Sequence, residues 1–189
     1  WGASSSWTLT ALPLFVWMGE ILFRTKLSEN LFEGLAPWLQ KLPGGLIHVN
    51  VVGCALFAAI SGSSAATVAT VGKMSIPELR KRKYPEKILL GSLAGSGTLG
   101  LLIPPSIILI IYGVTVQESI AKLFIAGIIP GIMIALIFMG YVIVWSLLNK
   151  NKMPTNYENF SFLNKLGKSK QLIPVILLIL GVIGSIYTG

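Results

Sequence analysis

The sequence has few charged residues and few of the residue types on which most active sites depend. Only 12% of its 189 residues are charged, about half of the fraction usual in soluble proteins. Its single cysteine, Cys54, excludes a disulfide framework and is expected to be a buried packing residue. The apolar segments contain no nucleophile–base pair and no cluster of metal ligands. We therefore expect neither an enzyme nor a transition-metal site.

What the sequence has instead is long apolar runs. Hydrophobic residues make up 53% of the chain, and the mean hydropathy is +0.77. About 20 helical residues span the hydrocarbon core of a bilayer, and the short alternating segments of a membrane β-barrel are not found. The sequence predicts an all-α, multi-pass integral membrane protein. Five segments are long enough to cross or enter the bilayer: 7–23, 46–74, 88–112, 123–148 and 172–187.

The basic residues lie in the connectors between these segments. A net charge of +8 would suit a nucleic-acid partner, but the lysines and arginines cluster at 80–87 and 150–170. Clusters beside membrane segments set orientation, with the positive side in the cytoplasm. We therefore expect both connectors on the cytoplasmic side, the link around Gln117 outside, and no nucleic-acid binding.

The apolar block 46–74 is interrupted at its centre by four small residues. These are Ser61, Gly62, Ser63 and Ser64, a composition typical of a turn. Either the block is one broken crossing, or it is a re-entrant helical hairpin that turns at these residues. The preceding stretch 24–45 favours the hairpin. It is amphipathic, with Leu27, Leu31, Leu35 and Trp38 on one side, which predicts a helix in the membrane interface, and it ends in LPGG, which suits a sharp turn.

A second interruption falls in the segment 88–112, within the stretch GSLAGSGTLGLLIPPS at 91–106. Pro104 and Pro105 have no N–H to give to the carbonyls of Gly100 and Leu101. Free carbonyls are tolerated at membrane depth only inside protein or beside a watery cavity. Together with nearby hydroxyls they suit a hard cation such as sodium. An alternative for Gly91 and Gly95 is close helix packing.

The two interruptions together suggest paired sites. A helix that starts after Ser64 would direct the positive end of its dipole at an anionic group. We therefore expect an ion site beside an anion site. Two other polar residues have simpler interpretations: Glu20 forms an interfacial ion pair with Arg24, and His48 is an interfacial or hydrogen-bonded residue rather than a ligand.

Several motifs resemble one family. The runs MGEILFR, LPGGL, SGSSAATVATVGKMSIPELRKRKY, GSLAGSGTLGLLIPPSIILIIYG and LFIAGIIPGI are similar to the large membrane subunit of tripartite ATP-independent periplasmic (TRAP) transporters. The resemblance covers about residues 9–141 and places them in the N-terminal repeat. It implies an elevator-type transporter built from inverted repeats in the bacterial inner membrane. Its driving force would be a sodium gradient, with no other cofactor.

The resemblance also implies partners and site residues. The partners are a small membrane subunit, a periplasmic binding protein and the transported molecule, a small organic anion such as a dicarboxylate or sialic acid. Sodium-binding residues would be Ser61, Gly62, Ser64, Gly95, Gly97, Thr98 and Gly100. Substrate-binding residues would be Ser63, Ser64, Ser96 and Pro104.

The predicted organisation has three parts. Residues 1–44 form a membrane helix and an interfacial arm, residues 45–148 a transport-type unit, and residues 149–189 a basic cytoplasmic loop and the start of another helix. The second repeat of the family is not in this sequence, so we expect a piece of a longer protein. Two alternatives remain: a sodium–carboxylate symporter without a binding protein, and a non-transporting membrane scaffold.

Overall fold

The computed structural model describes residues 7–154 and 162–188, and every element within these ranges is helical, as predicted. Residues 1–6 of the predicted first part and residues 155–161 and 189 of the predicted last part lie outside the described residues. The α-helices are α1 (Trp7–Arg24), α2 (Leu27–Leu39), α3 (Ile47–Ser61), α4 (Ser64–Lys81), α5 (Glu86–Gly97), α6 (Ile107–Val116), α7 (Ile120–Leu148), α8 (Phe162–Ser169) and α9 (Ile173–Thr188). Short 3-10 helices are η1 (Thr98–Leu101), η2 (Lys150–Lys152) and η3 (Lys170–Leu172).

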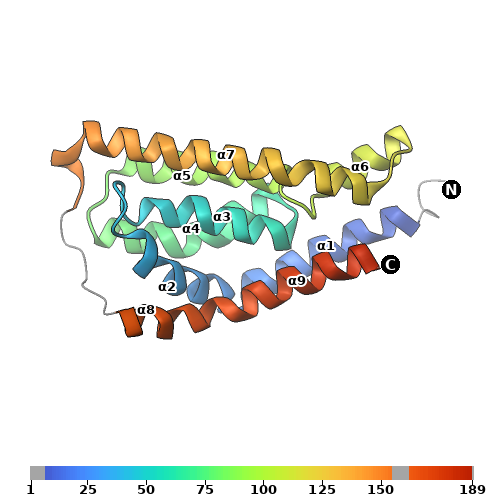
Figure 1. Cartoon of the computed structure of the whole chain (residues 1–189), viewed down its shortest axis with the longest axis horizontal. Helices are drawn as coiled ribbons and strands as arrows, with labels where there is room; N and C mark the ends of the chain where they lie inside the picture. Colours follow the sequence, from blue (N-terminus) through green and yellow to red (C-terminus); the bar gives the residue numbers. More distant parts are fainter. Residues whose placement is uncertain (1–6, 155–161, 189) are drawn as a thin grey trace.

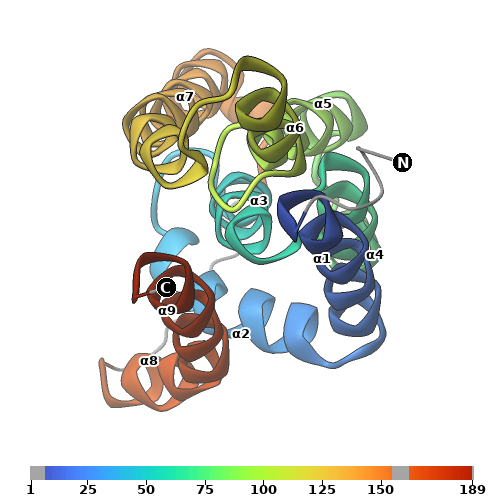
Figure 2. The same cartoon turned by 90° about the vertical axis from the view of Figure 1, so that its right-hand side faces the viewer.

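Helix α3 lies at the centre of the bundle (Figure 2). It packs against α1, α2, α4, α5, α7 and α9, and most of its residues are buried. Apart from His48, Asn50 and Ser61, its side chains are apolar, and such a helix is stable when it is surrounded by other helices. The central position of α3 therefore follows from its composition.

Helices α3 and α4 form a helical hairpin. They pack side by side and are joined at Gly62 and Ser63. With 15 residues, α3 is about 22 Å long, whereas the 29 residues of α7 extend over about 43 Å. Helices α1, α7 and α9 all continue past the end of the hairpin, which turns partway along the bundle (Figure 1).

The base of the hairpin has the sharp turn that LPGG predicted. Gly44 and Gly45 both have positive φ angles, which glycine adopts without a steric penalty. The Leu46 N–H donates to the Tyr84 hydroxyl at 3.0 Å, and His48 Nε2 lies 2.8 Å from the Pro43 carbonyl oxygen. Hydrogen bonds thus hold the base of the hairpin together and connect it to the link between α4 and α5.

The described parts of the two basic connectors lie at one end of the bundle. The α4–α5 link, the end of α7 and α8 are all at the left of Figure 1, whereas the α6–α7 link is at the right. In the part of the chain that the structure describes, two stretches are helical, long and apolar enough to cross a membrane: Ile120–Leu148 and Asn164–Ser185. The predicted segments 46–74 and 88–112 are each divided into shorter helices by their interruptions.

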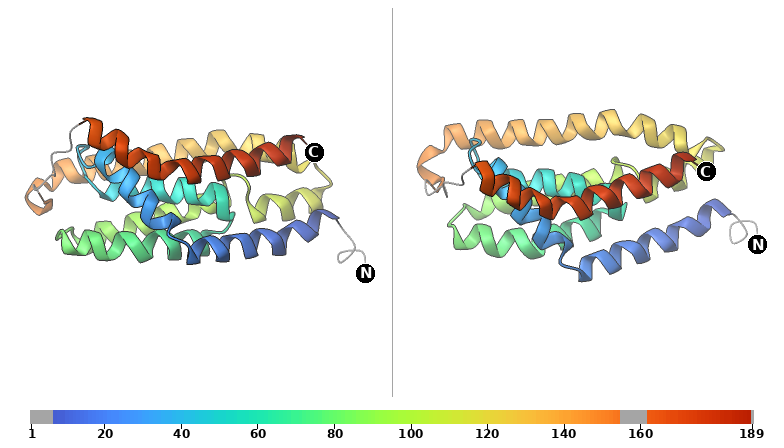
Figure 3. Two further views of the ribbon diagram at one scale, coloured as in Figure 1. Left: turned by 90° about the horizontal axis from the view of Figure 1, so that it is seen from below. Right: turned by 60° about the horizontal axis from the view of Figure 1, so that its bottom comes forward.

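Helix α2 packs on the hairpin. Leu31, Phe32 and Leu35 are buried because they join the core cluster that α3 and α4 form, and the placement of this helix in a membrane interface stays a prediction. Trp38 on the same helix is exposed, at 44%, and the side chain of Leu27 lies outside the described residues. Figure 3 shows α2 crossing between α4 and α9. The basic region after Leu148 is also not all loop, because α8 forms there and packs on α2.

Candidate functional site

The hairpin tip depends on Gly62. This residue ends α3 in the left-handed conformation, with φ +60, and its N–H donates to the Ala58 carbonyl at 3.0 Å. A Cβ atom at this position would lie 2.6 Å from the Pro105 carbonyl oxygen. Glycine is therefore required here both by the backbone angle and by the space available.

Three hydroxyl groups close the tip. Ser63 is the N-cap of α4, and its Oγ accepts from the Ala66 N–H at 3.4 Å. Thr67 Oγ1 donates to the Ser63 carbonyl at 2.7 Å and lies 2.9 Å from Ser61 Oγ. These bonds join the last residue of α3 to the first turn of α4, so the tip is held by its own side chains.

The second interruption is a break between α5 and α6, as predicted. The α-helix gives way to η1, the chain is irregular at 102–106, and α6 begins at Ile107. The prediction that the Leu101 carbonyl is free is wrong, because Ser106 Oγ donates to it at 2.8 Å. A side-chain hydroxyl thus replaces the backbone N–H that Pro105 lacks.

The structure brings the tip and the break together. The Ile107 N–H donates to the Gly62 carbonyl at 3.2 Å. A Cβ atom on Gly100 would lie 2.9 Å from the Ser64 nitrogen, and one on Gly97 would collide with the Val68 side chain. These glycines allow the backbones of η1 and α4 to approach each other closely.

Helix ends of both kinds meet at this contact. The carbonyl ends of α3 and η1 and the N–H ends of α4 and α6 lie within the segments that touch. Carbonyl ends attract cations, and N–H ends attract anions. Ser64 Oγ is buried here with no hydrogen-bond partner among the residues that the structure describes. A hydroxyl in this position is suited to contact an ion or a water molecule.

Other predicted site residues lie around this contact. Pro104 is buried within the irregular segment. The Thr98 side chain is exposed, and its Oγ1 donates to the Gly95 carbonyl at 2.7 Å. A Cβ atom on Gly95 would lie 3.3 Å from Phe138 of α7, in keeping with the packing alternative for this glycine. A Cβ atom on Gly91 would meet nothing within 4 Å in the described part of the chain.

Ser96 is not brought to the tip. It is fully buried between α3 and α5, where its Oγ donates to the Ser92 carbonyl at 2.6 Å and lies 3.3 Å from the Asn50 carbonyl oxygen. Asn50 Nδ2 in turn donates to Ser92 Oγ at 3.0 Å. The Asn50 carbonyl is more than two helical turns from Ser61 along α3. Ser96 therefore belongs to a polar contact between helices.

Sequence reasoning missed four residues of this region. They are Gly19 of α1, whose Cβ position lies 3.5 Å from Ser61 Cβ, together with Asn50, Thr67 and Ser106. Asn50 could have been noticed as a lone amide in an apolar run. Ser106 could have been noticed as a hydroxyl directly after two prolines.

Interrupted helices that meet inside a bundle are typical of membrane transporters, which bind substrates and ions near such interruptions. The particular family follows from comparison with known sequences. The chain belongs to the DctM family: the family model described as "Tripartite ATP-independent periplasmic transporter, DctM component" matches residues 1–189. The family resemblance seen in the motifs is thereby confirmed.

Individual relatives support the assignment to this family. The chain is 35% identical over 186 residues to the C4-dicarboxylate TRAP transporter large permease protein DctM of Pseudomonas aeruginosa, covering 98% of this chain and 43% of that protein. It is 33% identical over 187 residues to the ectoine/5-hydroxyectoine TRAP transporter large permease protein UehC of Ruegeria pomeroyi, covering 96% and 42%. It is 38% identical over 144 residues to the sialic acid TRAP transporter large permease protein SiaM of Vibrio cholerae, covering 75% and 34%. The chain thus spans less than half the length of these relatives.

Proposed function

We propose that this chain is the N-terminal half of an inverted-repeat, elevator-type permease that carries a small organic anion across the bacterial inner membrane together with sodium. The observation that carries the proposal is the contact between the two interruptions, where the Ile107 N–H meets the Gly62 carbonyl and Ser64 Oγ is buried without a partner among the described residues. In this proposal α3 and α4 form a re-entrant hairpin, since they turn partway along the bundle.

Sodium would lie between the tip and the break. Oxygen ligands available there are the Ser61 and Ser64 hydroxyls and the backbone carbonyls of Gly62, Gly97 and Gly100. The hydroxyl of Thr98 donates its hydrogen to the Gly95 carbonyl, which leaves its oxygen able to accept a cation. Hard cations prefer such oxygen sets.

The anion would lie next to the N-terminal ends of α4 and α6. Ser63 and Ser64 begin α4, and Pro104 lies just before α6. The names of relatives give C4-dicarboxylate, isethionate, sialic acid and ectoine as what those proteins transport. Since three of these are organic anions, we favour an anion for this chain as well. Because Ser96 points into the bundle, any part it has in binding substrate would be indirect.

The family name supports the proposed partners. A tripartite periplasmic transporter has three parts, and a large permease implies a small one. We propose that the chain works with a small membrane subunit and a periplasmic binding protein. This favours the tripartite transporter over the alternatives of a symporter without a binding protein and of a scaffold.

The proposal is tested by uptake into proteoliposomes that contain the full-length permease, its small subunit and its binding protein. Wild-type uptake should require an inward sodium gradient, which potassium does not replace. Ser64→Ala should raise the sodium concentration for half-maximal uptake about tenfold or more, as expected for the loss of one ligand to a charged group.

Two further variants and one control complete this test. Ser63→Ala and Thr98→Val should both reduce sodium-dependent uptake, Ser63→Ala through the anion site and Thr98→Val through the sodium site. Gly140→Ala on α7 is the control, because a Cβ atom there meets nothing within 4 Å in the described part of the chain. Unchanged sodium-dependent uptake in both Ser63→Ala and Thr98→Val would refute the site, and uptake without sodium in the wild type would refute the coupling.

A further inference from the structure

A second candidate site lies at the basic end of the bundle. It is a cavity of about 380 Å³ between α2, the second half of α4 and α8. This volume is within the range of small-molecule sites. Its lining residues on α4 lie in the half of that helix that is farther from the hairpin tip. The residues that line it include Phe32, Glu33, Gln40, Met74, Glu78, Arg82 and Lys168.

The lining is divided into an apolar and a charged part. Phe32, Leu46 and Met74 supply apolar surface, with Phe32 and Leu46 almost fully buried. The charged side chains are two carboxylates, Glu33 and Glu78, and two cations, Arg82 and Lys168. Their formal charges cancel, so the lining does not select for an ion of either sign alone.

The charged side chains are held in place by neighbouring helices. Arg82 Nε pairs with Glu78 Oε1 at 2.7 Å, one turn apart on α4. Glu33 Oε2 accepts from Gln171 Nε2 at 2.8 Å, which ties α2 to η3. The Trp38 indole donates to Ser169 Oγ at 2.9 Å, and Lys165 Nζ lies 5.5 Å from the Trp38 ring centre. Lys168 is therefore presented by a helix that is docked on α2.

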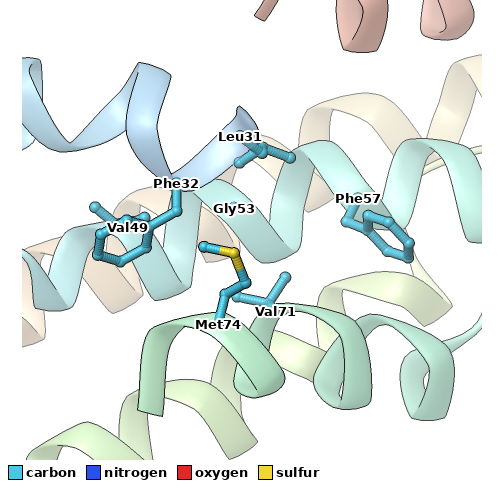
Figure 4. A pocket seen from close by; sticks show the side chains of 7 residues that line it. All are labelled: Leu31, Phe32, Val49, Gly53, Phe57, Val71 and Met74. Carbon is cyan, nitrogen blue, oxygen red and sulfur yellow. The ribbon is translucent and has the colours of Figure 1, made fainter. Parts of the chain in front are cut away.

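The apolar surface continues inward from the cavity. A much smaller cavity of about 10 Å³ lies between α2 and the hairpin and shares Phe32 and Met74 with the large one. Figure 4 shows Phe32 of α2 and Met74 of α4 on either side of it. The site is thus polar on one side and apolar on the other, in a protein whose family resides in the membrane.

From this arrangement we propose that the cavity binds the headgroup of a zwitterionic phospholipid, with phosphoethanolamine chemistry. The phosphate lies against Arg82 and Lys168, and the ammonium lies against Glu33 and Glu78. The glycerol and the first acyl carbons lie on Phe32 and Met74. Basic side chains at a membrane surface bind lipid phosphates. The carboxylates of Glu33 and Glu78 would favour a lipid whose headgroup also carries a primary ammonium. The proposal does not depend on which substrate is transported.

Native mass spectrometry of the full-length protein tests this proposal. Detergent-purified protein is delipidated and then given phosphatidylethanolamine, phosphatidylglycerol or phosphatidylcholine with identical acyl chains. We expect phosphatidylethanolamine to be retained several-fold more than the other two lipids. Glu33→Gln should lower the retention of phosphatidylethanolamine to that of phosphatidylglycerol. Lys168→Met should lower the retention of phosphatidylethanolamine and of phosphatidylglycerol.

Matched controls carry the same charge changes outside the cavity. Glu29→Gln lies one turn earlier on α2, and Lys150→Met lies at the same end of the bundle; both should leave retention unchanged. Equal retention of phosphatidylglycerol and phosphatidylethanolamine by the wild type would overturn the zwitterion assignment. Unchanged retention in both Glu33→Gln and Lys168→Met would overturn the location. Full displacement of the lipid by soluble phosphoethanolamine at equal concentration would overturn the role of the acyl chains.

Discussion

The hairpin tip and the proline break both interrupt a helix, but their polar groups are satisfied in different ways. At the tip, Ser61, Ser63 and Thr67 bond to one another within seven residues of chain. At the break, Ser106 satisfies one carbonyl, and the first N–H of α6 bonds to the tip. The tip is therefore a local unit, whereas the break takes its shape partly from the tip.

This difference has a consequence for binding. A site between the tip and the break would be held on the tip side by hydrogen bonds between residues close in sequence. On the side of the break it would be held by a contact between distant segments. Movement of the hairpin relative to α5 and α6 would change the break more than the tip. We therefore expect substitutions to reduce stability most where the two interruptions touch, and less at positions away from this contact.

The largest expected effect is that of Gly62→Ala. The new Cβ would be in a left-handed conformation and would collide with the Pro105 carbonyl, which also disturbs the bond from Ile107. We expect a loss of roughly 2 kcal/mol or more of unfolding free energy. Thermal unfolding in detergent measures it, with Gly140→Ala as the control. An unchanged unfolding temperature would contradict the close contact.

Gly100→Ala should come next, because it acts on the same contact from the other side. Its Cβ would lie 2.9 Å from the Ser64 nitrogen and 3.0 Å from the Ser63 carbonyl carbon. These are backbone atoms that move only with the helix, so we expect a loss of about 1–3 kcal/mol. Gly91→Ala on α5, which faces open space among the described residues, should have almost no effect. Equal effects of the two variants in thermal unfolding would argue against the contact.

Thr67→Val tests the local bonds of the tip. The change removes the hydroxyl that joins Ser61 to the Ser63 carbonyl while keeping nearly the same volume. Since both oxygens are in a buried region, we expect a cost of about 1–2 kcal/mol. Thr98→Val removes an exposed hydroxyl and should cost less than about 0.5 kcal/mol. Chemical or thermal unfolding measures the loss of stability in each variant. A larger loss for Thr98→Val than for Thr67→Val would show that the tip does not rely on its own side chains.

Ser64→Ala should have the smallest effect on stability. Its Oγ has no partner among the described residues, so removing it breaks no hydrogen bond. If this oxygen binds sodium, sodium but not potassium should raise the unfolding temperature of the wild type, and Ser64→Ala should lose most of that increase. An equal sodium effect in both proteins would place the ion elsewhere.

Much of the fold could be predicted from the sequence because local rules govern it. Glycine among serines places the first interruption at 61–64, and a glycine-rich stretch followed by two prolines places the second within 91–106. Apolar runs give the membrane helices, and clusters of basic residues mark one end of the bundle. Each of these features depends on residues that are close together in the chain.

The tertiary structure decided the rest, because it depends on partners far along the chain. Leu31 and Leu35 pack on the hairpin, since α3 and α4 offer an apolar surface there. Ser96 faces Asn50, 46 residues earlier in the chain, and not the tip. The sequence by itself determined where the two helices are interrupted. Only packing around α3 decided that Gly62 and Ile107 meet, because a hydrogen bond between distant residues has no local signal.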